Sequence, residues 1–411
     1  MAVIKPFRAV RPAEELASQI AALPYDVMNS QEAKTMVEGN PLSFLRIDRA
    51  EINFPEPVDP HAPQVYAKAR QLFLEMLAKG QFIQDDQDCF YIYRQIMDGR
   101  TQTGLVACTS IDDYNNDVIK KHEFTRPDKE QDRIEHIKAL EAQTGPIFQT
   151  YRDQEEITEL ISAWAEDHAP LYEFSAYGVE QICWKVDCPE TIERLISLFA
   201  AVPNLYIADG HHRSAAAVRV GMELRQKNPD PQAEFNYFLS VIFPASDLKI
   251  WPYNRVVKDL AGLTTEEFLS RIKERFVLEE APSSPFAPAE KGTFGLYLAG
   301  KWYKLTPHPG LVPADDPVHS LDVAVLQDHL LAPILGIEDP RRDGRIEFVG
   351  GIRGLTELER RVQEDMQVAF SLYPTSIAEV LAVADGNQVM PPKSTWFEPK
   401  LLSGLFIHKL F

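Results

Sequence analysis

The sequence has 411 residues, of which 45% are hydrophobic and 25% charged, a composition typical of a globular protein long enough for two packed units. Its 42 basic and 61 acidic side chains give a formal net charge of −19, which disfavours a broad interface with a phosphate backbone. The sequence has no apolar run long enough to cross a membrane, no apolar secretory core in MAVIKPFRAV, and no C-x-x-C pair among its four cysteines. We therefore expect a cytoplasmic protein with free thiols, without nucleic-acid or membrane partners, whose oligomeric state the sequence leaves unknown.

The first part of the chain mixes strand-like and helical patterns. Residues 3–10 and 42–48 have the composition of strands, whereas residues 30–39 and 63–79 carry the start, stop and spacing signals of helices. The dipeptide Asp98-Gly99 lies between two strand-like runs and predicts a β-hairpin, because both turn residues tolerate a positive φ.

The middle of the chain alternates further helices and strands. A helix is expected to open near Pro127, and a buried strand at LYIA is expected to lead into an alanine-rich helix. The other expected elements are helices at 154–166 and 189–200 and strands near 181–186 and 235–243.

From about residue 255 the pattern changes, which places the expected domain boundary between 1–254 and 255–411. The second part is expected to contain a helix at 264–276, a hairpin that turns at Gly300-Lys301, and a helix at 320–337. The fold class is therefore α+β (mixed α/β), with an N-terminal core and an additional α+β C-terminal lobe.

The segment YIADGHHRSAAAV, residues 206–218, concentrates polar residues where the predicted strand meets the predicted helix. The first N–H groups of a helix lack internal acceptors, and its dipole favours an anion there. Gly210 allows close backbone approach, Arg213 can pair with phosphate, and Asp209 suits a Mg²⁺ ion carried by that phosphate. The structural alternative is that Asp209 caps the helix, His211 and His212 are partly exposed, and Arg213 pairs with a carboxylate.

Three other segments carry candidate residues. The loop KKHEFTRPDKEQDR contains His122, Glu123 and Arg126, although such a charged loop is commonly only solvated. Asp26 in PYDV serves either as a helix cap or in catalysis. Lys393 in MPPKSTWFEPK is either part of a structural loop or a lysine that faces a ligand, and this segment is a candidate lid.

The segments PYDV, HEFTRP, GPIF, IADGHHRSAA and MPPKSTWFEPKLLSGL together resemble the family called domain of unknown function 1015, over essentially the full length. The DGHHR corner is also similar to the phosphate-binding corner of the ParB/sulfiredoxin superfold, which implies a ParB/sulfiredoxin-like core with a mixed sheet. Free serine kinases in that superfold carry a similar motif. Sulfiredoxin has a reactive cysteine where this chain has His211, and ParB has a basic DNA-binding surface, so neither of those activities is expected.

The kinase resemblance implies roles for the candidate residues, which phosphoryl-transfer chemistry would use for positioning and for charge neutralisation. Glu123 is the first candidate for the general base and Asp26 the second. Asp209 would hold Mg²⁺, and His212 would stabilise the transferring phosphoryl group. Phosphate binding is assigned to Gly210, His211, Arg213 and Ser214, and substrate binding to His122, Arg126 and Lys393.

The expected function is therefore that of a nucleotide-dependent small-molecule kinase that uses ATP or ADP with Mg²⁺ and phosphorylates the hydroxyl of a free amino acid, first of all L-serine to O-phosphoserine. A non-catalytic nucleotide-binding regulatory protein is the main alternative. A metal-dependent hydrolase that uses His122, Glu123, His211 and His212 is a third, although no spacing in the sequence ties two of these ligands to one face.

Overall fold

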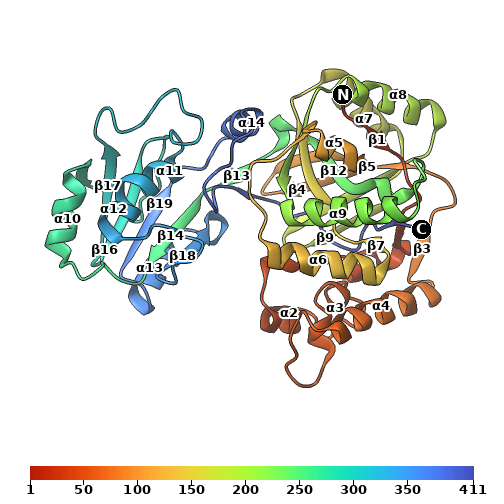
Figure 1. Ribbon diagram of the computed structural model, residues 1–411, viewed down its shortest axis with the longest axis horizontal. Coiled ribbons are helices and arrows are strands. Elements are labelled where there is room, and N and C mark those ends of the chain that lie inside the picture. The colour runs from red at the N-terminus through yellow and green to blue at the C-terminus, as the bar shows by residue number, and fades with distance from the viewer. The chain divides into compact units, whose positions relative to one another are not determined.

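The computed structural model describes residues 1–411, which form two units (Figure 1). The first unit comprises residues 1–248 and 399–411, and the second comprises residues 249–398. The division differs from the expected ranges 1–254 and 255–411, because the end of the chain belongs to the first unit. No helix in the structure combines the length and the apolar character needed to span a bilayer.

A nine-stranded mixed sheet forms the centre of the first unit, which confirms the predicted α+β class and the mixed sheet. Its strand order is β6-β11-β8-β12-β5-β4-β10-β9, and β1 pairs with β5. β6 and β11 are parallel, as are β8 and β12, whereas the other pairs are antiparallel. The strands are β1 (Ile4–Lys5), β4 (Phe90–Met97), β5 (Arg100–Ser110), β6 (Ile119–Lys120), β8 (Ile147–Tyr151), β9 (Tyr172–Ala176), β10 (Val179–Val186), β11 (Leu205–Asp209) and β12 (Tyr237–Pro244).

The predicted hairpin at Asp98-Gly99 is confirmed. Strands β4 and β5 pair up to Met97 and Arg100, and the two turn residues have φ values of 52° and 74°. Both values lie in the left-handed region that two-residue hairpin turns require. The dipeptide alone was therefore enough to predict this turn.

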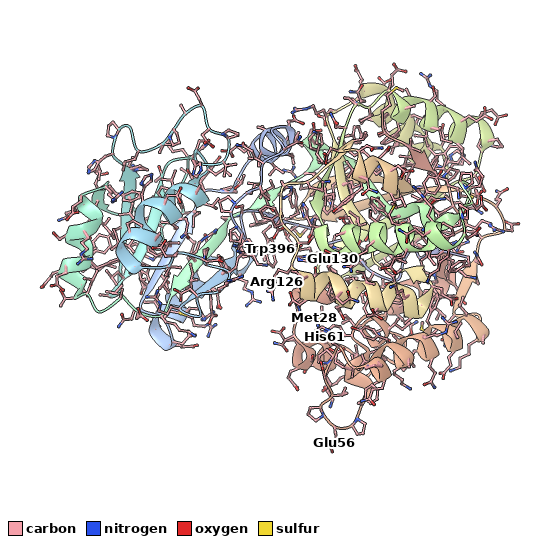
Figure 2. The ribbon with its side chains drawn as sticks, in the orientation of Figure 1. Met28, Glu56, His61, Arg126, Glu130 and Trp396 are labelled. Carbon is pink, nitrogen blue, oxygen red and sulfur yellow. The ribbon has the colours of Figure 1, made fainter.

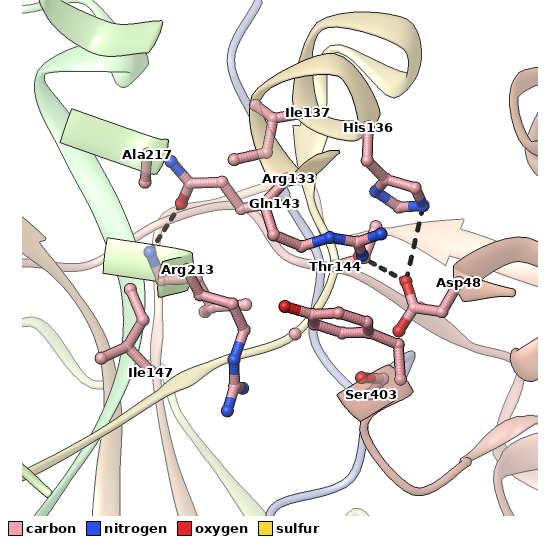
Figure 3. Close-up of a pocket in the computed structure, with 13 residues that line it drawn as sticks. Asp48, Arg133, His136, Ile137, Gln143, Thr144, Ile147, Arg213, Ala217 and Ser403 are labelled. Atoms are coloured by element: carbon pink, nitrogen blue, oxygen red, sulfur yellow. Dashed lines mark hydrogen bonds and ion pairs between the residues drawn. The ribbon is translucent and has the colours of Figure 1, made fainter. Parts of the chain in front are cut away.

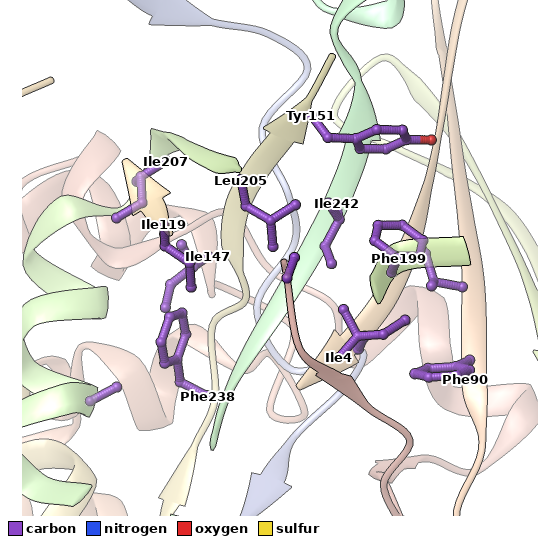
Figure 4. Close-up of a cluster of buried hydrophobic side chains, with 14 of the residues drawn as sticks. Ile4, Phe90, Ile119, Ile147, Tyr151, Phe199, Leu205, Ile207, Phe238 and Ile242 are labelled. Carbon is purple, nitrogen blue, oxygen red and sulfur yellow. The ribbon is translucent and has the colours of Figure 1, made fainter. Parts of the chain in front are cut away.

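Helices cover the sheet and bury a continuous apolar cluster against it (Figure 4). Ile147, Leu205, Ile207 and Ile242 from neighbouring strands lie in this cluster, each at most 2% exposed. Removal of these side chains from water stabilises the sheet on which the corner is built. The helices of the first unit are α1 (Ala17–Ile20), α2 (Ser30–Met36), α3 (Leu45–Asp48), α4 (Pro63–Ala78), α5 (Ile111–Asn115), α6 (Pro127–Leu140), α7 (Glu155–Asp167), α8 (Pro189–Ala200) and α9 (His211–Lys227).

Two small sheets attach segments near the two ends of the chain to the middle of the first unit. β2 (Val10–Pro12) pairs with β3 (Phe82–Gln84), and β7 (Ala142–Gln143) pairs with β21 (His408–Lys409) near the chain end. The last segment therefore folds as part of the first unit although the whole second unit precedes it in the chain.

The second unit contains a six-stranded antiparallel sheet in the order β15-β17-β16-β19-β14-β18. The predicted hairpin of β16 and β17 is present, but its turn residues are Ala299 and Gly300, one position before the predicted pair. The elements are β13 (Ile250–Trp251), β14 (Tyr253–Val257), α10 (Thr265–Lys273), β15 (Phe276–Glu280), β16 (Phe294–Leu298), β17 (Lys301–Pro307), α11 (Asp322–Leu326), a π-helical turn (Gln327–Leu331), α12 (Ala332–Leu335), β18 (Ile346–Gly350), α13 (Thr356–Glu364), β19 (Val368–Leu372), α14 (Ile377–Asp385) and β20 (Trp396–Phe397).

One predicted strand is wrong. Residues 42–48 form no strand and contain the short helix α3. Phe44, Leu45 and Ile47 are all buried in a second apolar cluster of the first unit, at 0%, 0% and 1% exposure. A short apolar run buried on every side has no periodicity that separates helix from strand, which accounts for the error.

Helix α9 packs closely on the segment that precedes β12, and Gly221 permits this approach. A Cβ atom at position 221 would lie 2.3 Å from the backbone oxygen of Phe235. We expect Gly221→Ala to lower the free energy of unfolding by about 1–3 kcal/mol, because the backbone must move to relieve the overlap. Urea denaturation of the variant measures this loss, with Met222→Ala on the exposed side of the same helix as the control. Equal stability of the two variants would contradict the close approach.

Candidate functional site

The predicted strand-to-helix corner is present in the structure. β11 ends at Asp209, Gly210 follows with a φ of 98°, and α9 begins at His211. The register of β11 against β8 shifts between Ile207 and Asp209, so the strand leaves regular pairing just before the turn. A left-handed φ favours glycine, and the turn therefore depends on Gly210.

The first turn of α9 has no side-chain cap. Gly210 supplies no side chain, and the N–H groups at this end of the helix carry its partial positive charge. Ser214 lies within the first turn, where its backbone N–H donates to the Gly210 carbonyl and its hydroxyl donates to the His211 carbonyl. Both Ser214 donors are thus used inside the helix, and this arrangement does not support direct phosphate contact by its side chain.

Asp209 forms an ion pair with a lysine from the end of the chain. The Lys400 Nζ donates to Asp209 Oδ2 at 2.9 Å. Burial alone would raise the pKa of Asp209, but Lys400 and Arg213 outweigh it and hold the pKa well below its usual range. The corner therefore carries an ionised carboxylate balanced by nearby cations.

His211 and His122 lie together beneath the corner. Their rings meet edge to face with centroids 4.5 Å apart, and His211 Nε2 accepts a hydrogen bond of 3.4 Å from the His122 backbone N–H. This leaves Nδ1 of His211 to carry the proton, and that atom lies 3.7 Å from a Glu123 carboxylate oxygen. Burial lowers the pKa of both imidazoles, that of His122 to about 4, so both are neutral at pH 7.

The loop before α6 also contacts the corner through Arg126, which follows Glu123 in the chain. The Arg126 backbone N–H donates to His212 Nε2 at 3.0 Å, while the Arg126 guanidinium pairs with Asp128. Figure 2 shows Arg126 and Glu130 at the start of α6. The predicted neighbours His122, Glu123 and Arg126 are thus brought to the DGHHR corner by direct contacts.

Arg213 lies at the inner edge of the corner. Its guanidinium packs against Gly210, where a Cβ atom would lie 3.2 Å from it, and its Nη1 donates to the Pro146 carbonyl at 2.5 Å. The Nε atom is buried without a hydrogen-bond partner, and the guanidinium forms no ion pair within 4.0 Å. The clamping of phosphate by Arg213 stays a prediction; the guanidinium acts on the charge of Asp209, with which it forms no direct ion pair.

A cavity adjoins the inner side of Arg213 (Figure 3). Tyr25, Asp48 and Arg133 line it together with Arg213. It lies between α6, α9 and the last segment of the chain, which contributes Ser403.

Two predicted site residues belong to other parts of the chain, one of them to the second unit. Asp26 lies exposed in the short turn Tyr25–Val27 and makes no hydrogen bond or ion pair with a corner residue, although its neighbour Tyr25 lines the cavity. Lys393 belongs to the second unit, where its ammonium lies 5.6 Å from the Tyr253 ring centroid. The roles assigned to both residues stay predictions.

The donor set of the corner bears on the expected Mg²⁺. The structure gathers no group of three or more His, Cys, Asp or Glu side chains suited to hold a metal ion. Mg²⁺ that accompanies a nucleotide needs only one or two protein carboxylates, because phosphates and water supply its other ligands. The assignment of Mg²⁺ to Asp209 stays a prediction, and the Asp209 carboxylate is already paired with Lys400.

Sequence reasoning missed three residues of this region. Lys400 ends the segment MPPKSTWFEPK, but Lys393 was selected from that segment instead. Asp48 and Arg133 lie far from the motif in sequence, and only tertiary structure brings them to the cavity. The one sequence signal for any of the three was that the segment containing Lys400 resembles the family named above.

A family model described as a protein of unknown function (DUF1015) matches residues 4–324. The chain belongs to this family. Comparison with curated proteins finds no match.

Three solved structures illustrate the likeness of fold. A free serine kinase in complex with AMP has 17% identity and a TM-score of 0.36, over 72% of this chain and 86% of that chain. A conserved hypothetical protein from Pyrococcus furiosus has 16% identity and a TM-score of 0.35, over 73% and 94% of the two chains. SbnI from Staphylococcus aureus, with a C-terminal truncation, has 12% identity and a TM-score of 0.39, over 72% and 85%. These likenesses concern the fold and do not identify the activity of this chain.

The glycine at the corner is open to a direct test. Gly210→Ala forces an L residue into the left-handed region and brings a Cβ atom to 3.2 Å from the Arg213 guanidinium. We expect it to lower the free energy of unfolding by about 1–2 kcal/mol and also to weaken anion binding at the corner. Gly80→Ala is the matched control, because Gly80 has a φ of 68° with no neighbour within 4 Å. Urea denaturation and ADP titration of both variants check this, and equal ADP affinity in the two would contradict it.

The buried imidazoles predict how stability depends on pH. The pKa of His122 falls from 6.5 to about 4 on folding, so between those values the unfolded chain binds more protons than the folded one. Stability contributed by His122 is therefore complete above pH 6.5 and decreases as the pH falls towards 4, by about 1.4 kcal/mol per pH unit at most. Urea denaturation between pH 7.5 and 4.5 should show a flatter profile for His122→Phe than for the unsubstituted protein. Parallel profiles would exclude this linkage.

Proposed function

We propose that this protein is a nucleotide-dependent phosphotransferase that binds phosphate at the start of α9 and phosphorylates the hydroxyl of a free amino acid, with L-serine as the first candidate. The observation that carries the proposal is the uncapped helix start at Gly210, with Lys400 and Arg213 beside it and Glu123 within reach of His211. Charge neutralisation and positioning are the two requirements of phosphoryl transfer, and this corner offers residues for both.

Phosphate oxygens would accept hydrogen bonds from the first-turn N–H groups of α9. Gly210 leaves this approach open because it has no side chain. The Lys400 ammonium lies 2.9 Å from Asp209, so a permanent cation is held at the same place. Both contributions favour an anion without any need for a charged histidine.

Glu123 is the proposed general base. Its side chain is 38% exposed, so an acceptor hydroxyl can reach it, and one oxygen lies 3.7 Å from His211 Nδ1. Because His211 is neutral and buried, it leaves the charge of the nearby Glu123 carboxylate in place. His212, whose Nε2 accepts from the Arg126 N–H, is the residue proposed to stabilise the transferring group.

The reaction balances with these residues alone and the two substrates. The acceptor oxygen forms a bond to the terminal phosphorus of the nucleotide, and the bond from that phosphorus to the bridging oxygen breaks. The hydroxyl proton goes to Glu123, and the shortened nucleotide leaves with the electron pair. Asp209 is the residue that would hold Mg²⁺, which when bound neutralises phosphate charge.

Purified protein with Mg²⁺ and either ATP or ADP provides the test, with a panel of free amino acids and small hydroxy acids as acceptors. The free serine kinase structure named above was solved with AMP, which makes adenine nucleotides the first donors to try. Phosphorylated product is measured by mass spectrometry and nucleotide conversion by chromatography. We expect Glu123→Gln to lower kcat by about 10²–10⁴-fold while nucleotide affinity is retained.

Two further variants complete the design. Asp209→Ala should abolish turnover, and Glu193→Gln, which changes an exposed glutamate on α8, is the control and should behave as the unsubstituted protein. Absence of turnover with every acceptor, together with saturable nucleotide binding, would overturn the phosphotransferase proposal and favour a nucleotide-binding regulatory protein.

A further inference from the structure

Three glutamines form a row across the central sheet of the first unit. Gln181 on β10 lies opposite Gln95 on β4, and Gln95 lies opposite Gln102 on β5. All three side chains are buried, with at most 2% of each residue exposed. Burial of an amide is costly unless its hydrogen bonds are made, so the partners of these glutamines show what the row holds in place.

The hydrogen bonds within the row fix the orientation of the Gln95 amide. Its Oε1 accepts from Gln102 Nε2 at 2.9 Å, and its Nε2 donates to Gln181 Oε1 at 3.1 Å. The Tyr93 hydroxyl donates to the same Gln181 oxygen. Because an amide nitrogen carries two hydrogens, Gln95 has one donor left after these contacts.

The remaining donor of Gln95 binds the returning end of the chain. Its Nε2 donates to the Lys400 carbonyl oxygen at 2.9 Å. The ammonium of the same lysine pairs with Asp209 at 2.9 Å. The strands β4 and β11, which carry these two partners, are not neighbours in the sheet. Lys400 is thus held at its backbone by one strand and at its side chain by another.

Aromatic contacts hold the same end segment against this face of the sheet. Tyr91, Tyr93 and Gln95 occupy alternate positions of β4, so their side chains point to one face. The Phe406 ring centroid lies 4.7 Å from that of Tyr91 and 6.4 Å from that of Tyr93. Such packing is tolerant of direction, whereas a hydrogen bond requires one distance and one angle. The glutamine row therefore fixes a backbone position that the aromatic packing leaves less well defined.

We infer that Gln95 is a positioning residue for Lys400 and that Gln102 and Gln181 orient its amide for this purpose. The inference rests on the proposed function, in which the Lys400 ammonium stands beside the phosphate-binding start of α9. It deepens that function by assigning part of the nucleotide affinity to a buried row that does not itself touch the nucleotide. Loss of the Gln95 donor removes one of the bonds that fix Lys400 relative to Asp209.

Chemical labelling of lysines tests the positioning without any assumption about activity. The Lys400 side chain is 10% exposed and its ammonium is paired, so we expect slow reaction with an N-hydroxysuccinimide ester in the unsubstituted protein. Gln95→Met keeps the length of the side chain but removes the donor. It should raise the labelling rate of Lys400 at least threefold and leave that of the exposed Lys79 unchanged. Peptide mass spectrometry measures both rates.

Gln149→Met is the matched control. Gln149 is also fully buried in the same sheet, on β8, but its Nε2 donates to the Thr109 hydroxyl on β5. This variant should lose stability and leave the labelling of Lys400 unchanged. Gln102→Met removes only the bond that orients Gln95, so it should give an intermediate labelling rate, and it replaces Gln95→Met if that variant does not fold. Circular dichroism checks the fold of each variant.

ADP calorimetry tests the link to phosphate binding. We expect Gln95→Met to weaken ADP binding about three- to tenfold and Lys400→Met to weaken it further. The double variant should bind ADP no more weakly than Lys400→Met alone, because Gln95 acts only through Lys400. Additive losses in the double variant would contradict this.

The outcomes separate this inference from the proposed function. Faster Lys400 labelling and non-additive ADP affinities, in a protein that transfers no phosphoryl group, would support the positioning role and overturn the phosphotransferase. Turnover with Lys400 labelling unchanged by Gln95→Met would support the phosphotransferase and overturn the positioning role, even if that variant were less stable. Absence of ADP binding by the unsubstituted protein would overturn both.

Discussion

Asp209 and Lys400 lie 2.9 Å apart although 191 positions separate them in the chain. The pair joins the end of β11 to a segment that the chain reaches only after the whole second unit. That segment is also fixed by backbone hydrogen bonds between Ser403 and Ala22 and between Ile407 and Val10. The electrostatic state of the corner thus depends on the correct return of the chain end, and the corner is complete only when the first unit has closed.

Because the buried histidines are neutral, the positive charge near the corner comes from lysine and arginine side chains. His122, His136 and His211 all have a lowered pKa because burial disfavours their charged form. At neutral pH they order their neighbours through hydrogen bonds and ring contacts but supply no positive charge. Lys400 and Arg213 are therefore the basic side chains that the corner presents beside Asp209.

Local sequence signals accounted for the elements that local interactions determine. The hairpin at Asp98-Gly99, the helix from Pro127 and the strand-to-helix corner at Gly210 each follow from residues that are adjacent in the chain. The helix α3 was misread because its apolar residues are buried on all sides, so their spacing indicates no single face.

The residues of the candidate site likewise fall into those that local sequence predicts and those that only tertiary structure brings together. The contiguous motif and the loop around Glu123 could be selected from sequence, because their residue types suit phosphate chemistry and lie close together. Asp48 and Lys400 could not, since an isolated acidic or basic residue at a remote position carries no local signal of its partner. Their places beside the corner and the cavity follow only from tertiary structure.

Arg213 belongs both to the corner and to the wall of the cavity on its inner side. Its side chain packs on Gly210 at the phosphate corner and lines the cavity that contains Asp48. An anion bound to Arg213 would reduce the positive charge near Asp209, whose low pKa depends in part on that guanidinium. A change of charge in the cavity would then alter the electrostatic state of the corner, and linkage requires an equal effect in the opposite direction. The cavity and the corner are therefore coupled through one guanidinium even if the backbone does not move.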